Sequence, residues 1–333
     1  MSERKTDIVI ITVDGNDPEW RKKKNHYAGI AEGDARDIRF RSWDNLHYLF
    51  RGIEKFAPWV NKVFLVTDNQ APKWLNPDYE KLELVNHSDF IPEKYLPVFS
   101  ANPIENNVFR IKGLSEQFVF FNDDTFLTDY VSEEQFFVDG LPCDFPRELP
   151  ITAHDRTFAH IMINDILMLN ENYRRQKVLK KHKKKFYSRQ CKGGRKTNLV
   201  YKKNRRNVFF GFFNNHMPNP FLKSTCKAVW EENYRWLDET CSHRFRNDND
   251  VNQYIFSHYQ YVNGLFHPYE WENKARLFRC NDRNTKSIAK AIVEQRYSMI
   301  CINEADDINI ETAKVVINSA FEQLLPEKSK FEL

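Results

Sequence analysis

The sequence of 333 residues has no apolar run close to the roughly 20 residues that cross a bilayer, and residues 1–6 are too polar for a signal peptide. We therefore expect a soluble, cytoplasmic protein. Its six cysteines stand singly, without a C-x-x-C pair or a histidine at metal-ligand spacing, so we expect reduced, mostly buried thiols. The sequence also lacks P-loop, glycine-rich dinucleotide, H-E-x-x-H and G-x-S-x-G motifs and any internal repeat, which excludes the commonest nucleotide-loop, zincin and hydrolase classes.

Aromatic residues are abundant, with 27 Phe, 14 Tyr and 7 Trp, and 41% of the residues are hydrophobic, as in folded globular proteins. The net charge of +4 conceals an uneven distribution. Residues 174–206 contain 16 Lys or Arg and no Asp or Glu, which leaves the other 300 residues with a net charge of −12. The sequence therefore describes an acidic body with one strongly basic segment.

Three apolar segments each end in a polar loop that contains aspartate. They are residues 7–13, before Asp14-Gly15-Asn16; residues 62–67, before Asp68; and residues 118–121, before Asn122-Asp123-Asp124. Helical spacing of apolar residues between them predicts an α/β fold with a mostly parallel central sheet and flanking helices. In such sheets ligands bind beyond the carboxyl ends of the strands, where all three loops would lie.

Other patterns predict helices. Residues 43–56 and 311–325 carry apolar residues at helical spacing. Asn102-Pro103 and Asn219-Pro220 each match an N-cap followed by proline at the first helical position, and a further helix is expected from about Asp248 onward. We divide one catalytic domain into an α/β part at residues 1–170, a basic insertion at 171–210 and a mainly helical part at 211–333.

The basic segment, residues 174–206, permits two interpretations. It is too charged for a core, so the simpler interpretation is a solvated, mobile surface insertion. The functional interpretation is contact with anionic membrane lipid or with a charged lipid-linked glycan, which would place the protein peripherally at the inner face of the cell membrane.

Asn122, Asp123 and Asp124 close the most hydrophobic strand of the chain. Two adjacent carboxylates at a strand end are costly unless a cation joins them, and Mg²⁺ or Mn²⁺ shared with substrate phosphates would do so. An Asx turn with solvated side chains explains the pair equally well. Asp123 and Asp124 are therefore candidate metal ligands, with Asn122 beside them.

His216 and Arg246 each precede a predicted helix start, where unpaired N–H groups and the helix dipole favour phosphate. Arginine can bond two phosphate oxygens, and neutral histidine can accept a proton from an attacking hydroxyl. Taken singly, a structural histidine and a surface arginine are the commoner explanations. Glu105 and Arg110 share the helix predicted after Asn102, where they form either an intrahelical charge arrangement or, for the glutamate, a wall of the ligand cleft.

Longer stretches resemble the Stealth family. Residues 13–20 are similar to its first conserved region; residues 41–46, 57–60, 66–76, 100–105 and 121–124 to its second; residues 215–218 to its third; and Arg246, Asp248, Asp250 and the aromatic helix after them to its fourth. The matches follow the family's order over most of the chain. Thr12 departs from the pattern, since the family usually has Trp there, and this alters the expected shape of the nucleotide pocket.

The resemblance implies a Rossmann-like or GT-A-like nucleotide-sugar-binding core with a helical C-terminal part. It also implies a hexose-1-phosphate transferase that uses a UDP-sugar, releases UMP and modifies a hydroxyl of a glycan or lipid-linked oligosaccharide in capsular or cell-surface polysaccharide synthesis. By motif position the active-site residues are Glu105, Asp124, His216 and Arg246.

This resemblance suggests a different catalytic role for each of these residues. Asp124, with Asp123, would hold the metal on the diphosphate, Arg246 would stabilise the developing charge, and either His216 or Glu105 would accept the acceptor's proton. The remaining substrate contacts are assigned to Asp14, Gly15, Asn16, Arg41, Arg51, Arg110 and Asn122.

Two other functions are compatible with the residues. A GT-A-like glycosyltransferase would use the same UDP-sugar and acidic pair but release UDP, and only the family resemblance favours phosphoryl transfer. A nucleic-acid-binding protein would set the basic segment against phosphates, with steep salt dependence. We do not expect nucleic acid as a partner, because the rest of the chain is acidic and no nucleic-acid module surrounds the segment.

Overall fold

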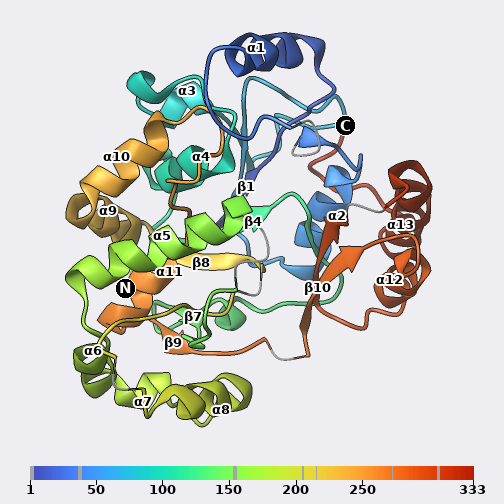
Figure 1. Cartoon of the computed structure of the whole chain (residues 1–333). Helices are drawn as coiled ribbons and strands as arrows, with labels where there is room; N and C mark the ends of the chain where they lie inside the picture. Colours follow the sequence, from blue (N-terminus) through green and yellow to red (C-terminus); the bar gives the residue numbers. More distant parts are fainter. Residues whose placement is uncertain are drawn as a thin grey trace.

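A computed structural model describes residues 4–36, 40–152, 156–204, 206–214, 216–271, 273–305 and 308–333. Helices cover both faces of a central sheet (Figure 1). The helices are α1 (Pro18–Ala28), α2 (Leu46–Phe56), α3 (His87–Phe90), α4 (Ala101–Asn107), α5 (Arg156–Asn172), α6 (Arg175–Lys181), α7 (Lys183–Phe186), α8 (Lys192–Tyr201), α9 (Lys223–Glu232), α10 (Tyr234–Ser242), α11 (Tyr254–Asn263), α12 (Thr285–Val293) and α13 (Ile310–Leu324). The strands are β1 (Thr6–Ile11), β2 (Val63–Thr67), β3 (Leu82–Asn86), β4 (Gln117–Asn122), β5 (Thr125–Leu127), β6 (Phe137–Val138), β7 (Leu141–Asp144), β8 (Asn219–Leu222), β9 (His267–Pro268), β10 (Ala275–Cys280) and β11 (Met299–Glu304).

The central sheet has the strand order β3-β2-β1-β4-β8. β1 pairs in parallel with β2 and β4, and β2 with β3, whereas β8 is antiparallel to β4. The predicted mostly parallel sheet is therefore confirmed. Because the order runs outward from β1 in both directions, the carboxyl ends of β1 and β4 form the switch point at which such sheets bind ligands.

Alternate residues of β1 face two separate hydrophobic cores. Ile8 and Ile10 belong to a core built with α2, α12 and α13, whereas Val9 belongs to a core built with α4, α9, α10 and α11. β4 alternates in the same way. Strands buried on both faces read as continuous apolar runs, which is why the sequence identified them.

A second sheet, of order β10-β11-β5, positions the end of β11 beside the loop after β4. β5 follows the loop directly and pairs antiparallel with β11, and the amide of Ile302 donates to the carbonyl oxygen of Asp124 at 2.9 Å. This pairing brings Cys301 and Asn303 next to Asp124, although Asn303 lies 179 residues further along the chain. A third small sheet has the order β6-β7-β9.

Three predicted helix starts differ from the structure. Asn219–Leu222 form strand β8, not the start of a helix, and α9 begins at Lys223. Pro220 is tolerated because β8 is an edge strand, where a missing N–H breaks no second ladder. Similarly, α11 begins at Tyr254 and α4 at Ala101. His216 and Arg246 consequently lie in loops and not at helix N-termini, so that argument for phosphate binding is wrong.

Residues 174–206 fold, where described, into α6, α7 and α8, which lie together at the lower end of the molecule (Figure 1). Arg175 is only 1% exposed, and its guanidinium contacts the carboxylate of buried Glu148 at 2.5 and 2.8 Å. The prediction that the segment is too charged for a core is wrong at this residue, because a paired and hydrogen-bonded charge can be buried.

The six cysteines are all buried, and none forms a disulfide among the described residues, as predicted. Among the described residues, none of the helices combines the length and the apolarity needed to span a bilayer.

Candidate active site

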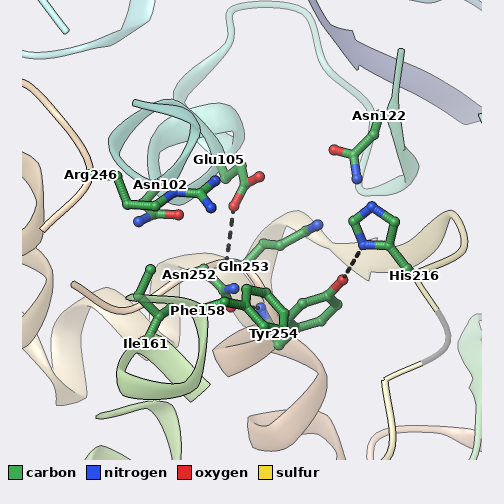
Figure 2. Close-up of a pocket in the computed structure, with 10 residues that line it drawn as sticks. All are labelled: Asn102, Glu105, Asn122, Phe158, Ile161, His216, Arg246, Asn252, Gln253 and Tyr254. Carbon is green, nitrogen blue, oxygen red and sulfur yellow. Dashed lines mark hydrogen bonds between the residues drawn. The ribbon is translucent and has the colours of Figure 1, made fainter. Parts of the chain in front are cut away.

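A pocket with about 350 Å³ of empty space lies beyond the carboxyl end of β4 (Figure 2). Four of the predicted site residues, Glu105, Asn122, His216 and Arg246, line it together. They come from α4, the end of β4 and two loops. The other lining residues are Asn102, Phe158, Ile161, Asn252, Gln253 and Tyr254.

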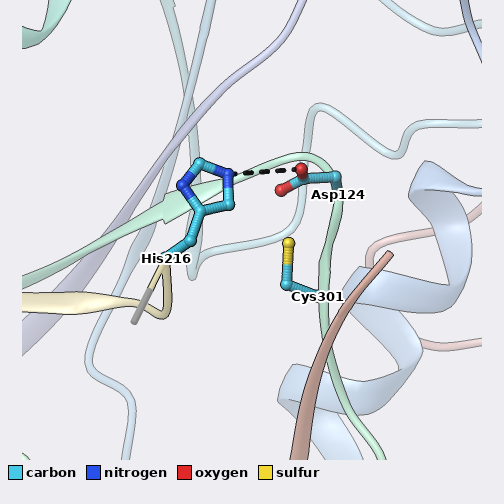
Figure 3. Close-up of side chains that lie close together, drawn as sticks. All are labelled: Asp124, His216 and Cys301. Carbon is cyan, nitrogen blue, oxygen red and sulfur yellow. Dashed lines mark ion pairs between the residues drawn. The ribbon is translucent and has the colours of Figure 1, made fainter. Parts of the chain in front are cut away.

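His216 lies between Tyr254 and Asp124. Its Nδ1 is 3.2 Å from the Tyr254 hydroxyl, and its Nε2 is 3.5 Å from Asp124 Oδ2 (Figures 2 and 3). Asn303 Nδ2 donates to Asp124 Oδ2 at 3.0 Å and lies 3.4 Å from His216 Nε2. His216 has a φ of +51°, a strained conformation for a residue other than glycine and one that clusters at functional sites.

The charges of His216 and Asp124 support each other. Burial alone would lower the pKa of His216, but the contact with the Asp124 carboxylate and its charge, with Glu105 beyond, outweigh burial and raise that pKa above 6.5. Burial would likewise raise the pKa of Asp124, but the contact with His216 reverses this and lowers it. His216 therefore binds its proton more tightly than a free imidazole does.

Glu105 and Arg246 form the opposite wall. Glu105 is buried on α4, and its Oε2 accepts a hydrogen bond from the backbone N–H of Gln253 at 3.4 Å. Burial raises the pKa of Glu105, and the charge of Arg246 opposes part of the shift. The Arg246 guanidinium points toward Glu105 (Figure 2), and the amide of Asp34 donates to the Arg246 carbonyl at 2.9 Å.

Asp250 fixes the loop that carries Arg246. Its fully buried carboxylate accepts hydrogen bonds from the side-chain Nδ2 of Asn102 at 2.8 Å and from the backbone N–H of Asn247 at 2.9 Å. It also pairs with His243 Nδ1 at 2.7 Å. Because Asn102 lies on α4, this carboxylate ties the loop to the helix that carries Glu105.

The two predicted metal ligands lie in different surroundings. Asp123 Oδ2 accepts from Thr12 Oγ1 at 2.8 Å, and burial together with the charge of Asp124 raises the pKa of Asp123 to about 6. Asp124 groups instead with His216 and Cys301, whose potential ligand atoms all lie within 4.8 Å of one another. Burial, together with the charge of Asp124, holds the pKa of the Cys301 thiol well above its usual value, and sulfur is a softer ligand than Mg²⁺ or Mn²⁺ prefers.

The loop after β1 lies at the neighbouring strand end but does not line the pocket. The side chain of Gln70 accepts from the Asp14 amide and donates to the Asp14 carbonyl, both at 2.9 Å. The Asn16 amide donates to Asp14 Oδ1 at 2.9 Å. Gly15 is required by packing within the protein, because a Cβ there would lie 2.0 Å from the carbonyl oxygen of Phe40.

Three arginines predicted to bind substrate lie outside the pocket. Arg41 pairs with Glu304, at the end of β11, at 3.4 Å. Arg51 is buried, and its Nε and Nη2 contact the two carboxylate oxygens of Glu332 at 2.9 Å each. Arg110 lies 4.7 and 4.8 Å from the centroids of two aromatic rings. The structure therefore keeps Arg41 near the site and places Arg51 and Arg110 in contacts within the fold.

The sequence patterns do not single out Gln253, Tyr254 or Asn303. Gln253 and Tyr254 follow Arg246 in the same resembling stretch, which is the signal that points to them. Gln253 is 3% exposed, its Oε1 has no hydrogen-bond partner among the described residues, and its side chain extends between Glu105 and His216 (Figure 2). Asn303 carries no such signal, because only the pairing of β5 with β11 brings it to Asp124.

Comparison with known proteins identifies the family. The family models for Stealth protein conserved region 2 and conserved region 3 match residues 39–143 and 215–263. A receptor polysaccharide phosphotransferase of Streptococcus gordonii, WefC, is 40% identical over 338 residues, which cover 99% of each chain. The chain belongs to the Stealth family. Two other relatives are a capsular polysaccharide phosphotransferase of Streptococcus pneumoniae, WcwK, 40% identical over 99% of each chain, and an exopolysaccharide phosphotransferase of Lactiplantibacillus plantarum, cps2G, 34% identical over 98% of this chain and 96% of the relative.

The Stealth regions account for most of the pocket. Region 2 contains Glu105 and Asn122, and region 3 contains His216 and Arg246. Of the lining residues, Phe158 and Ile161 on α5 lie outside both regions. Region 3 continues through Arg246 and α11, so the assignment of that stretch to a fourth Stealth region is wrong.

Proposed function

We propose that this chain transfers hexose-1-phosphate from a UDP-sugar to a hydroxyl of a glycan or lipid-linked oligosaccharide, with release of UMP, in the synthesis of a capsular or other cell-surface polysaccharide. The proposal rests on 40% identity over 99% of the chain to proteins named polysaccharide phosphotransferases. The acceptor and the enzyme would meet in the cytoplasm at the inner face of the cell membrane.

In the proposed reaction, the acceptor oxygen bonds to the β-phosphorus while the bond from that phosphorus to the oxygen bridging to the α-phosphate breaks. His216 is the proposed base, because its Nε2 is 3.5 Å from Asp124, too far for a strong hydrogen bond, and can bond an acceptor hydroxyl instead. The Asp124 carboxylate would then stabilise the imidazolium that forms. Its effect on the pKa of His216 supports this assignment over Glu105.

Arg246 is proposed to bond the oxygens of the transferring phosphoryl group, with Glu105 orienting its guanidinium. Asn122 and Gln253 would contact the same substrate from the pocket wall. Asp14, Gly15, Asn16 and Arg41 would hold the nucleotide at the neighbouring end of β1. Arg51 and Arg110 have no part in this proposal, since contacts within the fold already engage them.

A Mg²⁺ or Mn²⁺ ion fits the donors at the end of β4. Mg²⁺ is usually bound through one or two carboxylates together with substrate phosphates, and Asp124 is placed to provide such a carboxylate. When bound, the ion would add positive charge to the diphosphate oxygens. Burial and, after it, repulsion from the Asp124 carboxylate raise the pKa of Asp123; a bound cation would offset both costs, which supports Asp123 as a second ligand.

The test is to identify the nucleotide released when the purified chain acts on UDP-sugars and glycan acceptors with Mg²⁺ or Mn²⁺. UMP is expected, and His216→Ala and Asp124→Asn should each lower the rate on the order of 10²–10³-fold while the proteins still melt cooperatively. UDP as the sole product would instead identify a glycosyltransferase. Near-wild-type turnover in either variant would remove that residue from the proposed chemistry.

A further inference from the structure

We propose that the basic unit, α6, α7 and α8 within residues 174–206, is a docking surface for an anionic phospholipid bilayer. The docking goes beyond the reaction proposed above and does not depend on it. Figure 1 shows the three helices grouped at one end of the molecule, outside the central sheet.

The exposed lysines of the basic unit carry charge that the fold does not use. Among the residues that the structure describes, the side-chain amino groups of six exposed lysines take part in no ion pair or hydrogen bond; they are those of Lys177, Lys181, Lys184, Lys192, Lys196 and Lys203. Residues 174–206 contain no acidic residue that could neutralise them from within. Such a cluster attracts a surface with negative charge.

The basic unit is firmly attached to the body of the protein. Lys185 Nζ donates to the carbonyl oxygens of Gly264 and Phe266 at 2.7 and 2.6 Å, and the Gly194 amide donates to Glu270 Oε1 at 2.6 Å. With the Arg175–Glu148 pair, these contacts hold the helices in fixed positions. The exposed lysines therefore project from folded helices that are attached to the rest of the protein.

The outer side of α8 distinguishes a lipid surface from nucleic acid. Leu199 and Val200 are 40% and 69% exposed, and Lys196 and Lys192 lie one and two turns before them on the same helix. Lysines beside exposed aliphatic side chains are the composition of helices that lie in the membrane interface, where the apolar groups enter the acyl boundary. A phosphate backbone would bind the lysines but would give the aliphatic side chains no apolar partner.

The position of α5 connects this surface with the pocket. Phe158 and Ile161, near the start of α5, line the pocket, and α6 follows almost directly after its end. The 17 residues of α5 span about 25 Å. If the proposed function holds, docking of the basic unit would bring the pocket, which shares α5 with it, close to a glycan carried on a membrane lipid.

The experiment is cosedimentation of the purified full chain with vesicles. Binding is expected to vesicles that contain phosphatidylglycerol and not to pure phosphatidylcholine. The variant Lys177→Gln/Lys181→Gln/Lys184→Gln should lower the partition coefficient on the order of 100-fold. The control Lys112→Gln/Lys227→Gln/Lys286→Gln removes the same charge from exposed lysines elsewhere and should bind like the wild type. His216→Ala should also bind fully, which separates docking from the reaction.

Equal partitioning of the two triple variants, both with wild-type melting temperatures, would overturn the proposal. Absence of binding to phosphatidylglycerol vesicles would do the same. Salt-sensitive binding to duplex DNA without vesicle binding would assign the surface to nucleic acid. Leu199→Ser/Val200→Ser tests the apolar contribution separately and should weaken vesicle binding about 10-fold or more.

Discussion

Gln253 is the residue at which stability and function conflict most clearly. Its side chain is 3% exposed, and its Oε1 finds no hydrogen-bond partner among the described residues. An unsatisfied buried acceptor costs about 1–3 kcal/mol. Natural sequences keep such a cost where a ligand supplies the missing bond, and this side chain extends into the candidate site between Glu105 and His216 (Figure 2).

Gln253→Met should therefore leave the melting temperature unchanged or raise it, while raising the KM for the proposed UDP-sugar donor about 10-fold or more. Gln260→Met is the matched control, because Gln260 lies on α11, is fully buried and also has an unpartnered Oε1, yet does not line the pocket. Thermal melts and steady-state kinetics of both variants provide the measurement. A destabilised Gln253→Met protein with an unchanged KM would indicate a packing residue.

The sequence predicted which residues lie in the candidate site better than it predicted the local structure around them. Motif position selected Glu105, Asp124, His216 and Arg246; the structure places three of them in the lining of one pocket and Asp124 beside it, 3.5 Å from His216. The local argument for His216 and Arg246 was wrong, because neither lies at a helix N-terminus. Asparagine followed by proline matches a helix start, but it also suits an edge strand, and only the pairing with β4 decides between them.

At the scale of structural elements, the loop between α10 and α11 is held by one buried carboxylate. Asp250 pairs with His243 and accepts bonds from Asn102 and Asn247, so it fixes the backbone on both sides of Arg246. The hydrogen bond to Asp250 raises the pKa of His243 above 6.5, although burial opposes the shift. The loop therefore gains stability when His243 is protonated.

This contact predicts a pH dependence of folding. Because the folded protein binds the His243 proton more tightly than the unfolded chain does, the added stability is complete below pH 6.5 and declines as the pH rises through the folded-state pKa. His243→Gln removes this titration. The difference in free energy of unfolding between wild type and His243→Gln should be larger at about pH 6 than at about pH 9, measured by urea denaturation.

The control for this experiment is His26→Gln, on an exposed position of α1. Its difference from wild type should not follow the His243 pattern. If the difference for His243→Gln were the same at both pH values, the pair with Asp250 would not contribute the expected proton-linked stability.

At the scale of the whole molecule, the apolar runs predicted the fold class because strands buried on both faces leave long hydrophobic segments. Contacts between segments far apart in the chain produce no comparable pattern in the sequence. The pairing of β5 with β11 brings Asn303 to Asp124, and no motif or periodic pattern around Asn303 predicts this contact. Arg51 illustrates the same limit, since its partner lies 281 residues away at the end of the described chain.

Residues 326–333 fasten the end of the described chain to the segment after β2. The Asn76 amide donates to the Phe331 carbonyl and the Leu333 amide to the Trp74 carbonyl, both at 2.8 Å. Next to these bonds, the Glu332 carboxylate accepts hydrogen bonds from Nε and Nη2 of Arg51 on α2. Arg51 thus joins three parts of the molecule and is a stabilising residue, where the sequence suggested a substrate contact.

Arg51→Met should lower the free energy of unfolding by about 3–5 kcal/mol, because it leaves the Glu332 carboxylate buried without its main partner. Arg51→Met combined with Glu332→Leu should recover most of this loss, since the double variant leaves neither charge unpaired. The KM for the proposed UDP-sugar donor should stay within about twofold of wild type in both proteins, whereas Arg41→Met, beside the site, should raise this KM without a comparable loss of stability. Urea denaturation and kinetics under urea-free conditions provide the measurements. A higher KM in the double variant would indicate that Arg51 contacts the substrate. Equal stability of wild type, Arg51→Met and the double variant would show that Arg51 does not stabilise the fold.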